Sequence, residues 1–343
     1  MADWLRIFKW PIAATVTGLA AATAYGGFAA FGAVAILIAL ETTVSFDNAV
    51  VNAGVLRELG EHWRHAFLTV GVLIAVFGMR VLFPLAIVSF ATGTSIAGVA
   101  GQALHERDAY ASNVESAAPM IGAFGGTFLL SLAFNFLLAP DRERHWIAPL
   151  ERWLSKAGRA PFAPVIATGG TLLAAVWWVS SEHERITMLA GFVGMVTFLI
   201  INAFRHVMRR GQRHRHECLA GAAGFAGFLY LETLDASFSL DGVLGAFAIS
   251  SDIVLVAIGL GVGAVFVRSL TVHLVRHETL CAMPYLAHGA HWAIGTLGVF
   301  LLIGIERQPP EWLTGGISVA IVAAAWASSL AARRTEARTR SCT

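Results

Sequence analysis

Apolar stretches long enough to cross a lipid bilayer recur along the whole chain. They run for ~17–28 residues, and a transmembrane helix needs about 20. Backbone polar groups cannot stay unpaired in lipid, so each stretch is predicted as a helix. We predict ten spans, near residues 11–27, 29–55, 65–90, 118–138, 162–181, 186–204, 218–246, 252–275, 285–305 and 313–332. The expected fold is therefore an all-α, polytopic membrane protein.

The composition agrees with a bilayer environment. Charged residues make up 13% of the chain, whereas soluble domains have about 25%. The lipid bilayer is therefore an expected partner, while a net charge of +2 gives no indication of nucleic acid. The three cysteines are scattered and form no disulfide framework. The N-terminal segment is predicted to be a retained first span rather than a cleaved signal peptide.

The distribution of basic residues predicts the orientation, because Lys and Arg are retained on the cytoplasmic side. With a cytoplasmic N-terminus, the ten spans place nineteen basic residues inside and three outside. Both termini are therefore expected on the cytoplasmic side of the cell inner membrane. The basic segment 205–217 is predicted to be a cytoplasmic anchor. The Gly-, Ala- and Ser-rich segment 91–117 is predicted to be a loop that lies on the outer surface or folds back towards the site.

One acidic motif occurs twice. Glu41-Thr-Thr-Val-Ser45-Phe-Asp47-Asn48 aligns without a gap with Asp235-Ala-Ser-Phe-Ser239-Leu-Asp241-Gly242. The motifs lie in spans two and seven, and the following spans contain Arg80 and Arg268. Spans five apart cross the membrane in opposite directions, so we predict an inverted five-plus-five repeat. Its halves, 1–181 and 182–343, would form one membrane domain with the site near the midplane.

The predicted spans hold more acids than arginines. A charge at a helix centre costs about 2.5–3.5 kcal/mol on insertion scales. The five carboxylates are Glu41, Asp47, Glu232, Asp235 and Asp241. Two arginines leave about three negative charges for a divalent cation or protons to balance. The structural alternative is that buried acid–arginine pairs only fix helix packing.

The motif residues do not all share one helix face. On a regular helix, Glu41, Ser45 and Asn48 lie on one stripe, as do Glu232, Asp235 and Ser239. Asp47 and Asp241 would lie about 120° from their partner acids. We therefore predict a local break or kink at both motifs, and unwound backbone there would expose carbonyl oxygens.

Oxygen ligands of this kind suit Mg²⁺, Ca²⁺ and Mn²⁺. The expected metal ligands are Glu41, Asp47, Asn48, Asp235 and Asp241. The expected supporting residues are Ser45, Ser239, Glu232, Arg80, Arg268, His288 and His291. The two histidines are open to a ligand role, a proton-relay role or an ordinary core role. Small residues such as Gly259, Gly261, Gly263 and Ala264 are expected to allow close helix packing.

The strings ETTVSFDNAVVNA (41–53) and LYLETLDASFSLDGVLGAFAISSDIVLVAIGLGVGAVFVRSLTVHL (229–274) resemble the TerC-type integral membrane proteins. The resemblance is stronger to a TerC-related family of uncharacterised bacterial membrane proteins, in the LysE-like transporter superfamily. It implies transport, with links to manganese export and metal homeostasis. A plant relative linked to thylakoid biogenesis keeps a role without transport open.

The sequence thus predicts a secondary transporter that exports a divalent cation, with Mn²⁺ favoured over Ca²⁺ or Mg²⁺ and protons as the coupling ion. One alternative is a metal-binding membrane sensor or assembly factor without transport. Another is an intramembrane hydrolase, but HExxH and GxSxG motifs are missing, so no enzyme is expected. The sequence leaves homo-oligomerisation, the metal and the direction of transport open.

Overall fold

The computed structural model describes residues 2–140, 142, 144–210, 220–250, 252–276, 283–307 and 309–341. Side chains are described for most of these, but not for Asp47, Ser239 or Asp241. The elements within these ranges are helices. They are α1 (Ala2–Val44), α2 (Phe46–Leu56), α3 (Glu61–Leu68), α4 (Val70–Leu73), the π-helix η1 (Ile74–Leu82), α5 (Phe83–Thr92), α6 (Ile96–His105), α7 (Arg107–Leu137), α8 (Ala148–Ala157), α9 (Ala163–Trp178), α10 (Ser181–Arg210), α11 (Gly221–Ile249), α12 (Ile253–Arg276), α14 (Leu286–Ile303) and α15 (Glu311–Ser341).

The protein is an all-α protein with the helices of a membrane protein. Within the described ranges, seven helical segments are long and apolar enough to cross a bilayer. They are Ile7–Thr42, Glu61–Phe90, Asp108–Leu137, Ser181–Phe204, Ile253–Arg276, Leu286–Ile303 and Gly316–Arg333. A shorter apolar helix covers Ala163–Trp178. Each of the ten segments predicted from sequence overlaps helices of the structure over its described residues.

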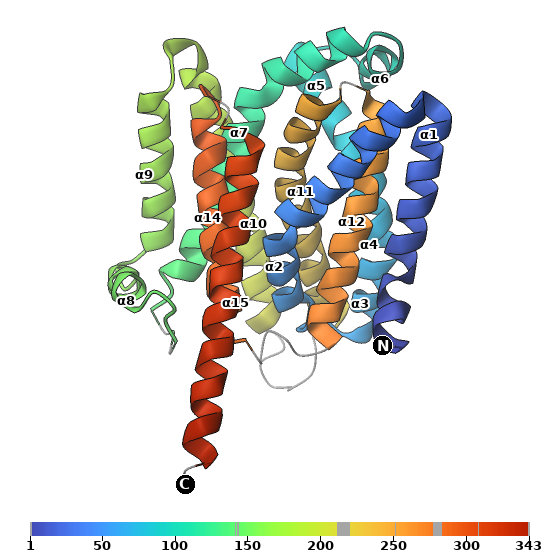
Figure 1. Cartoon of the computed structure of the whole chain (residues 1–343). Coiled ribbons are helices and arrows are strands. Elements are labelled where there is room, and N and C mark those ends of the chain that lie inside the picture. Colours follow the sequence, from blue (N-terminus) through green and yellow to red (C-terminus); the bar gives the residue numbers. More distant parts are fainter. Residues whose placement is uncertain are drawn as a thin grey trace.

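The first two predicted spans meet at a sharp kink in α1. Gly26 and Gly27 leave helical geometry there, and Gly27 has φ 68° and ψ −154°, which glycine adopts without a side-chain clash. Figure 1 shows the first limb of α1 rising to this bend and the second limb returning towards α2. The kink therefore makes a helical hairpin where the sequence predicted two spans.

The predicted breaks at the two acidic motifs have different outcomes. In the first motif, Ser45 separates α1 from α2 and has φ −86° and ψ 15°. In the second motif, α11 is continuous from Gly221 to Ile249, so the predicted break there is wrong. One glycine costs a helix only about 1 kcal/mol. An unpaired backbone group in an apolar environment costs several. Continuous helix is thus the cheaper state at Gly242.

The third predicted span is not one regular helix. It is divided at Thr69 and continues through η1, a nine-residue π-helix that carries Arg80. π-helical turns are rare and are frequent at functional sites. Hydrophobicity alone did not reveal this irregularity, because a largely apolar run predicts a helix but not its hydrogen-bonding pattern.

The segment 91–117 was predicted to be a loop, but most of it is helical. Residues 96–105 form α6, and α7 begins at Arg107. The Ser95 side chain accepts a hydrogen bond of 3.2 Å from the Gly98 N–H, which caps the first turn of α6. Ser95 thus marks the start of a helix, which the Gly and Ser content of the segment concealed. The basic segment 205–217 is described only as far as Arg210, and the rest lies outside the described residues.

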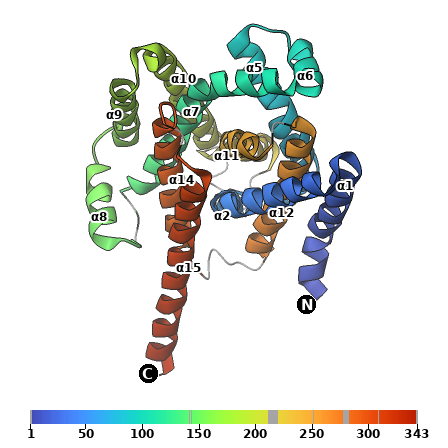
Figure 2. The same ribbon diagram turned by 45° about the horizontal axis from the view of Figure 1, so that its top comes forward.

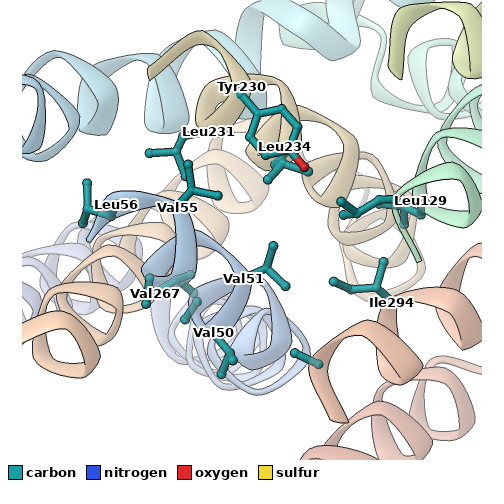
Figure 3. Packing of buried hydrophobic residues seen from close by; sticks show 14 of the residues in the cluster. Val50, Val51, Val55, Leu56, Leu129, Tyr230, Leu231, Leu234, Val267 and Ile294 are labelled. Atoms are coloured by element: carbon teal, nitrogen blue, oxygen red, sulfur yellow. The ribbon is translucent and has the colours of Figure 1, made fainter. Parts of the chain in front are cut away.

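The long helices run side by side, and the start of α1 and the end of α15 lie at the same end of the bundle (Figures 1 and 2). A buried hydrophobic cluster joins α2, α7, α11, α12 and α14. Figure 3 shows this packing, in which the labelled residues are Val50, Val51, Val55, Leu56, Leu129, Tyr230, Leu231, Leu234, Val267 and Ile294. Leu234 and Val267 are the chain neighbours of Asp235 and Arg268. The cluster therefore fixes the backbone that carries these charges.

Candidate functional site

Three acids and two arginines from both halves of the chain form a buried network. Glu41 lies near the end of α1, Arg80 on η1, Glu232 and Asp235 on α11, and Arg268 on α12. Each is 2–5% exposed. Charges this deeply buried must be paired to be tolerated. We call these five residues, together with Asn48, the carboxylate–arginine network.

In the first half of the network, Arg80 forms an ion pair with Glu41. Ser45 donates a hydrogen bond of 3.1 Å to Oε1 of Glu41. Arg80 also donates from Nη1 to the carbonyl oxygen of Ala75 at 3.0 Å. That bond lies within η1, so the π-helix helps to orient the guanidinium.

In the second half, Arg268 binds Glu232 with two hydrogen bonds, at 3.1 and 3.2 Å. Its Nη2 also lies 3.1 Å from Oδ2 of Asp235. The guanidinium carbon lies 3.8 Å from the ring centre of Phe67, and Nη1 donates to the Phe67 carbonyl oxygen at 2.9 Å. Paired donors and a cation–π contact hold this arginine firmly.

Asp235 connects the two halves. Its Oδ1 accepts a hydrogen bond of 3.0 Å from the Asn48 amide, 187 residues away in sequence. Its Oδ2 lies 3.9 Å from Nη1 of Arg80 as well as 3.1 Å from Nη2 of Arg268. The carboxylate of one motif is thus shared between both arginines and the asparagine of the other motif.

Two glycines allow this close packing. A Cβ on Gly263 would lie 2.4 Å from Cγ of Glu41, and one on Gly71 would lie 2.5 Å from Nη1 of Arg268. A Cβ on Gly259 would lie 2.4 Å from Cβ of Leu37. The predicted close approach at Gly259 and Gly263 is therefore confirmed. The role of Gly71 was not predicted.

The described part of the network carries one negative charge in excess when its acids are ionised. The side chains of Asp47, Ser239 and Asp241 lie outside the described residues, although their backbones lie in α2 and α11. Among the described side chains, no group of three or more His, Cys, Asp or Glu residues is placed to hold a metal ion. Of the expected ligands, the structure brings Glu41, Asn48 and Asp235 together, with arginines between the acids.

Asn52 is a polar residue that the sequence reasoning missed. It is 1% exposed, and its Oδ1 has no hydrogen-bond partner among the described residues. Asn52 follows Asn48 by one turn of α2, so both amides lie on one helix face. That four-residue spacing was readable in the sequence. A buried amide oxygen without a donor is a suitable cation ligand.

His288 and His291 belong to a second cluster. His288 Nδ1 lies 2.8 Å from Oε2 of Glu151, and the indole of Trp292 donates to Oε1 of Glu151 at 3.0 Å. The ring of His291 stacks on Phe136 with 3.6 Å between ring centres. The structure therefore places both histidines with residues of α7 and α8, and not with the carboxylate–arginine network.

Glu151 is fully buried and was not predicted, because it lies between two predicted spans and belongs to neither acidic motif. Burial alone would raise the pKa of this carboxyl. The hydrogen bonds from His288, Trp292 and the Trp146 backbone outweigh burial and lower the pKa to about 2. Burial also lowers the pKa of Arg142, whose guanidinium carbon lies 4.2 Å from the ring centre of Phe136. We call Arg142, Glu151, His288 and Trp292 the end cluster.

Residues 46–336 match a family model described as Protein of unknown function (DUF475). The matched region includes every member of the carboxylate–arginine network except Glu41. No curated protein and no solved structure was found to match the chain.

Proposed function

The chain belongs to the family described as Protein of unknown function (DUF475), and from that premise we propose that it is a secondary transporter of a divalent cation. Mn²⁺ is the favoured substrate, exported from the cytoplasm. The observation that carries the proposal is Asp235, a buried carboxylate that both arginines and Asn48 share. A carboxylate held between two halves of a membrane protein can change partners when a cation arrives. The resemblance to TerC-type proteins points to the same substrate class.

The proposed architecture has ten spans in an inverted five-plus-five repeat, with halves 1–181 and 182–343. The pairing of charges supports it. Glu41 pairs with Arg80 of the following span, and the aligned Asp235 pairs with Arg268 of its following span. Transporters built from inverted repeats bind substrate where the repeats meet, near the midplane. The basic residues favour cytoplasmic termini in the inner membrane.

In the proposed mechanism, the cation competes with the arginines for the carboxylates. Its ligands would be Glu41, Asp47, Asn48, Asp235 and Asp241, with Ser45, Ser239 and Glu232 in support. Hard divalent cations prefer such oxygen ligands. Each arginine keeps one buried donor, its Nε, without a hydrogen-bond partner in the described part of the chain. Protons would neutralise the acids as the metal leaves, which gives metal–proton exchange.

A metal-binding sensor or assembly factor without transport is the second candidate. The observation that favours it is that each described carboxylate of the network already has an arginine partner. Paired charges of this kind can act as clamps between helices. This protein would bind metal but show no flux.

Mn²⁺ uptake into inside-out vesicles tests the proposal. Wild type is expected to accumulate Mn²⁺ when a pH gradient is imposed, Asp47→Asn is expected to lose uptake, and the exposed-site control Glu61→Gln is expected to retain it. Uptake that does not respond to the pH gradient would contradict proton coupling. Binding without uptake by correctly oriented wild type would contradict transport and favour the sensor.

A further inference from the structure

An apolar groove of about 690 Å³ runs along the outside of the bundle between α5, α7 and α10. Its walls include Ile87 and Phe90 of α5, Phe124 of α7, and Leu189 and Val193 of α10. Phe90 is 79% exposed and Leu189 is 56% exposed, so the groove opens to the surroundings of the bundle. In a chain whose long helices suit a bilayer, those surroundings are lipid.

The groove has a closed apolar end and a charged end. At the apolar end, α7 and α10 approach so closely that a Cβ on Gly194 would lie 2.3 Å from the carbonyl oxygen of Phe124. Glu182 and Arg185 line the other end, in the first turns of α10. From Glu182 to Val193 the lining residues of α10 extend for about 16 Å. This shape suits a chain molecule with one polar end.

The charged end carries both signs. Glu182 and Arg185 are exposed, and neither side chain forms an ion pair or a hydrogen bond with another residue among those the structure describes. They lie three residues apart, which makes them neighbours on the helix surface. The connection from α9 to α10 lies at the end of the bundle opposite the start of α1 (Figure 1). The two charges therefore lie where lipid headgroups would be expected.

We propose that this groove binds one phospholipid with an ethanolamine headgroup. An acyl chain lies along α10, Arg185 binds the phosphate, and Glu182 binds the ammonium group. A phosphate and an ammonium joined by two carbons match an arginine and a glutamate one helical turn apart. A purely anionic headgroup would leave Glu182 facing negative charge, so the pair of charges favours the zwitterionic lipid.

Native mass spectrometry of the full chain tests this, with phosphatidylethanolamine and phosphatidylglycerol of the same acyl chains added in equal amounts. Wild type is expected to retain phosphatidylethanolamine in about tenfold preference. Arg185→Gln is expected to lower its retention about tenfold, because a charge-assisted hydrogen bond is lost. Glu182→Gln is expected to remove the preference for phosphatidylethanolamine over phosphatidylglycerol. Glu184→Gln, an exposed acid of the same turn outside the groove, is the matched control and is expected to behave as wild type.

A separate variant tests the apolar part of the groove. Val193→Phe fills the space with an added ring and is expected to lower retention of both lipids while the two headgroup charges stay in place. Equal retention of the two lipids by wild type, or full retention by Arg185→Gln, would overturn the proposal. A stable dimer that carries no lipid would overturn the proposal and would indicate that a second copy of the chain occupies the groove.

Discussion

The carboxylate–arginine network and the end cluster are both buried and charged, yet they differ in how their charges are satisfied. In the end cluster, one carboxylate accepts hydrogen bonds from a histidine, an indole and a backbone N–H. In the network, three carboxylates share two arginines, and Asp235 belongs to both. A carboxylate that accepts hydrogen bonds from several donors rigidifies a structure. Three carboxylates that share two arginines leave one negative charge in excess. This difference is consistent with a structural clamp at the end cluster and with the proposed cation site at the carboxylate–arginine network.

The largest expected effect comes from removing one arginine of the network. Arg268→Met leaves Glu232 without its bidentate partner and Asp235 with one arginine fewer. Breaking a buried pair on one side costs about 3–5 kcal/mol. Thermal unfolding of the purified protein measures this loss. Arg276→Met, an exposed arginine two turns further along α12, is the control and is expected to change stability by less than about 0.5 kcal/mol. If Arg268→Met and Arg276→Met lowered the stability equally, the distinction between paired and solvated arginines would be wrong.

A smaller effect is expected from crowding the network. Gly263→Ala adds a Cβ beside Cβ and Cγ of Glu41, at 2.6 and 2.4 Å, so the backbone or Glu41 must shift. Overpacking of this kind costs about 1–3 kcal/mol. The control is Gly54→Ala in α2, where a Cβ meets nothing within 4 Å. That change is expected to be neutral or to stabilise the helix by up to about 1 kcal/mol. The unfolding midpoints of Gly263→Ala and Gly54→Ala are compared with that of wild type. An unchanged midpoint in Gly263→Ala would show that the contact with Glu41 is loose.

The smallest expected effect concerns the pH dependence of the end cluster. The pKa of Glu151 is lowered from 4.5 to about 2 in the folded protein. A lowered carboxyl pKa stabilises the fold above the unfolded pKa, and this stabilisation is lost as the pH falls through the folded pKa. The stabilisation from the Glu151 carboxylate is therefore expected to be fully present above about pH 4.5, as measured by the difference in melting temperature between wild type and Glu151→Gln. It should shrink as the pH falls from about 4.5 towards 2. A difference that grows in this range would contradict the assignment.

Much of the fold followed from local sequence. Apolar runs predicted the helices, because the length of an apolar segment can be compared directly with the thickness of the bilayer. The bend at Gly26 and Gly27 was marked by the boundary between two runs. The uninterrupted helix at Gly242 was mispredicted because the acidic motif looked the same in both halves of the sequence. The π-helix that carries Arg80 was not predicted, because no hydrophobicity pattern in the sequence marks it.

The site was less accessible to sequence reasoning. The repeated motif identified Glu41, Asn48 and Asp235, since intramembrane acids are rare enough to be informative. Their mutual arrangement depends on contacts across 187 residues, which no local pattern encodes. Glu151 was missed because it lies between two predicted spans, while its partners His288 and Trp292 come from α14. Tertiary contacts, not composition, decide which charge is buried.

Mn²⁺ binding to the purified protein, followed by the electron paramagnetic resonance signal of free Mn²⁺, tests the central claim most directly. The carboxylate–arginine network predicts that wild type binds Mn²⁺, that Asp235→Asn weakens binding about tenfold or more, and that Glu151→Gln binds as wild type does. Unchanged binding in Asp235→Asn, or binding lost only in Glu151→Gln, would contradict the assignment of the cation site to the centre of the bundle.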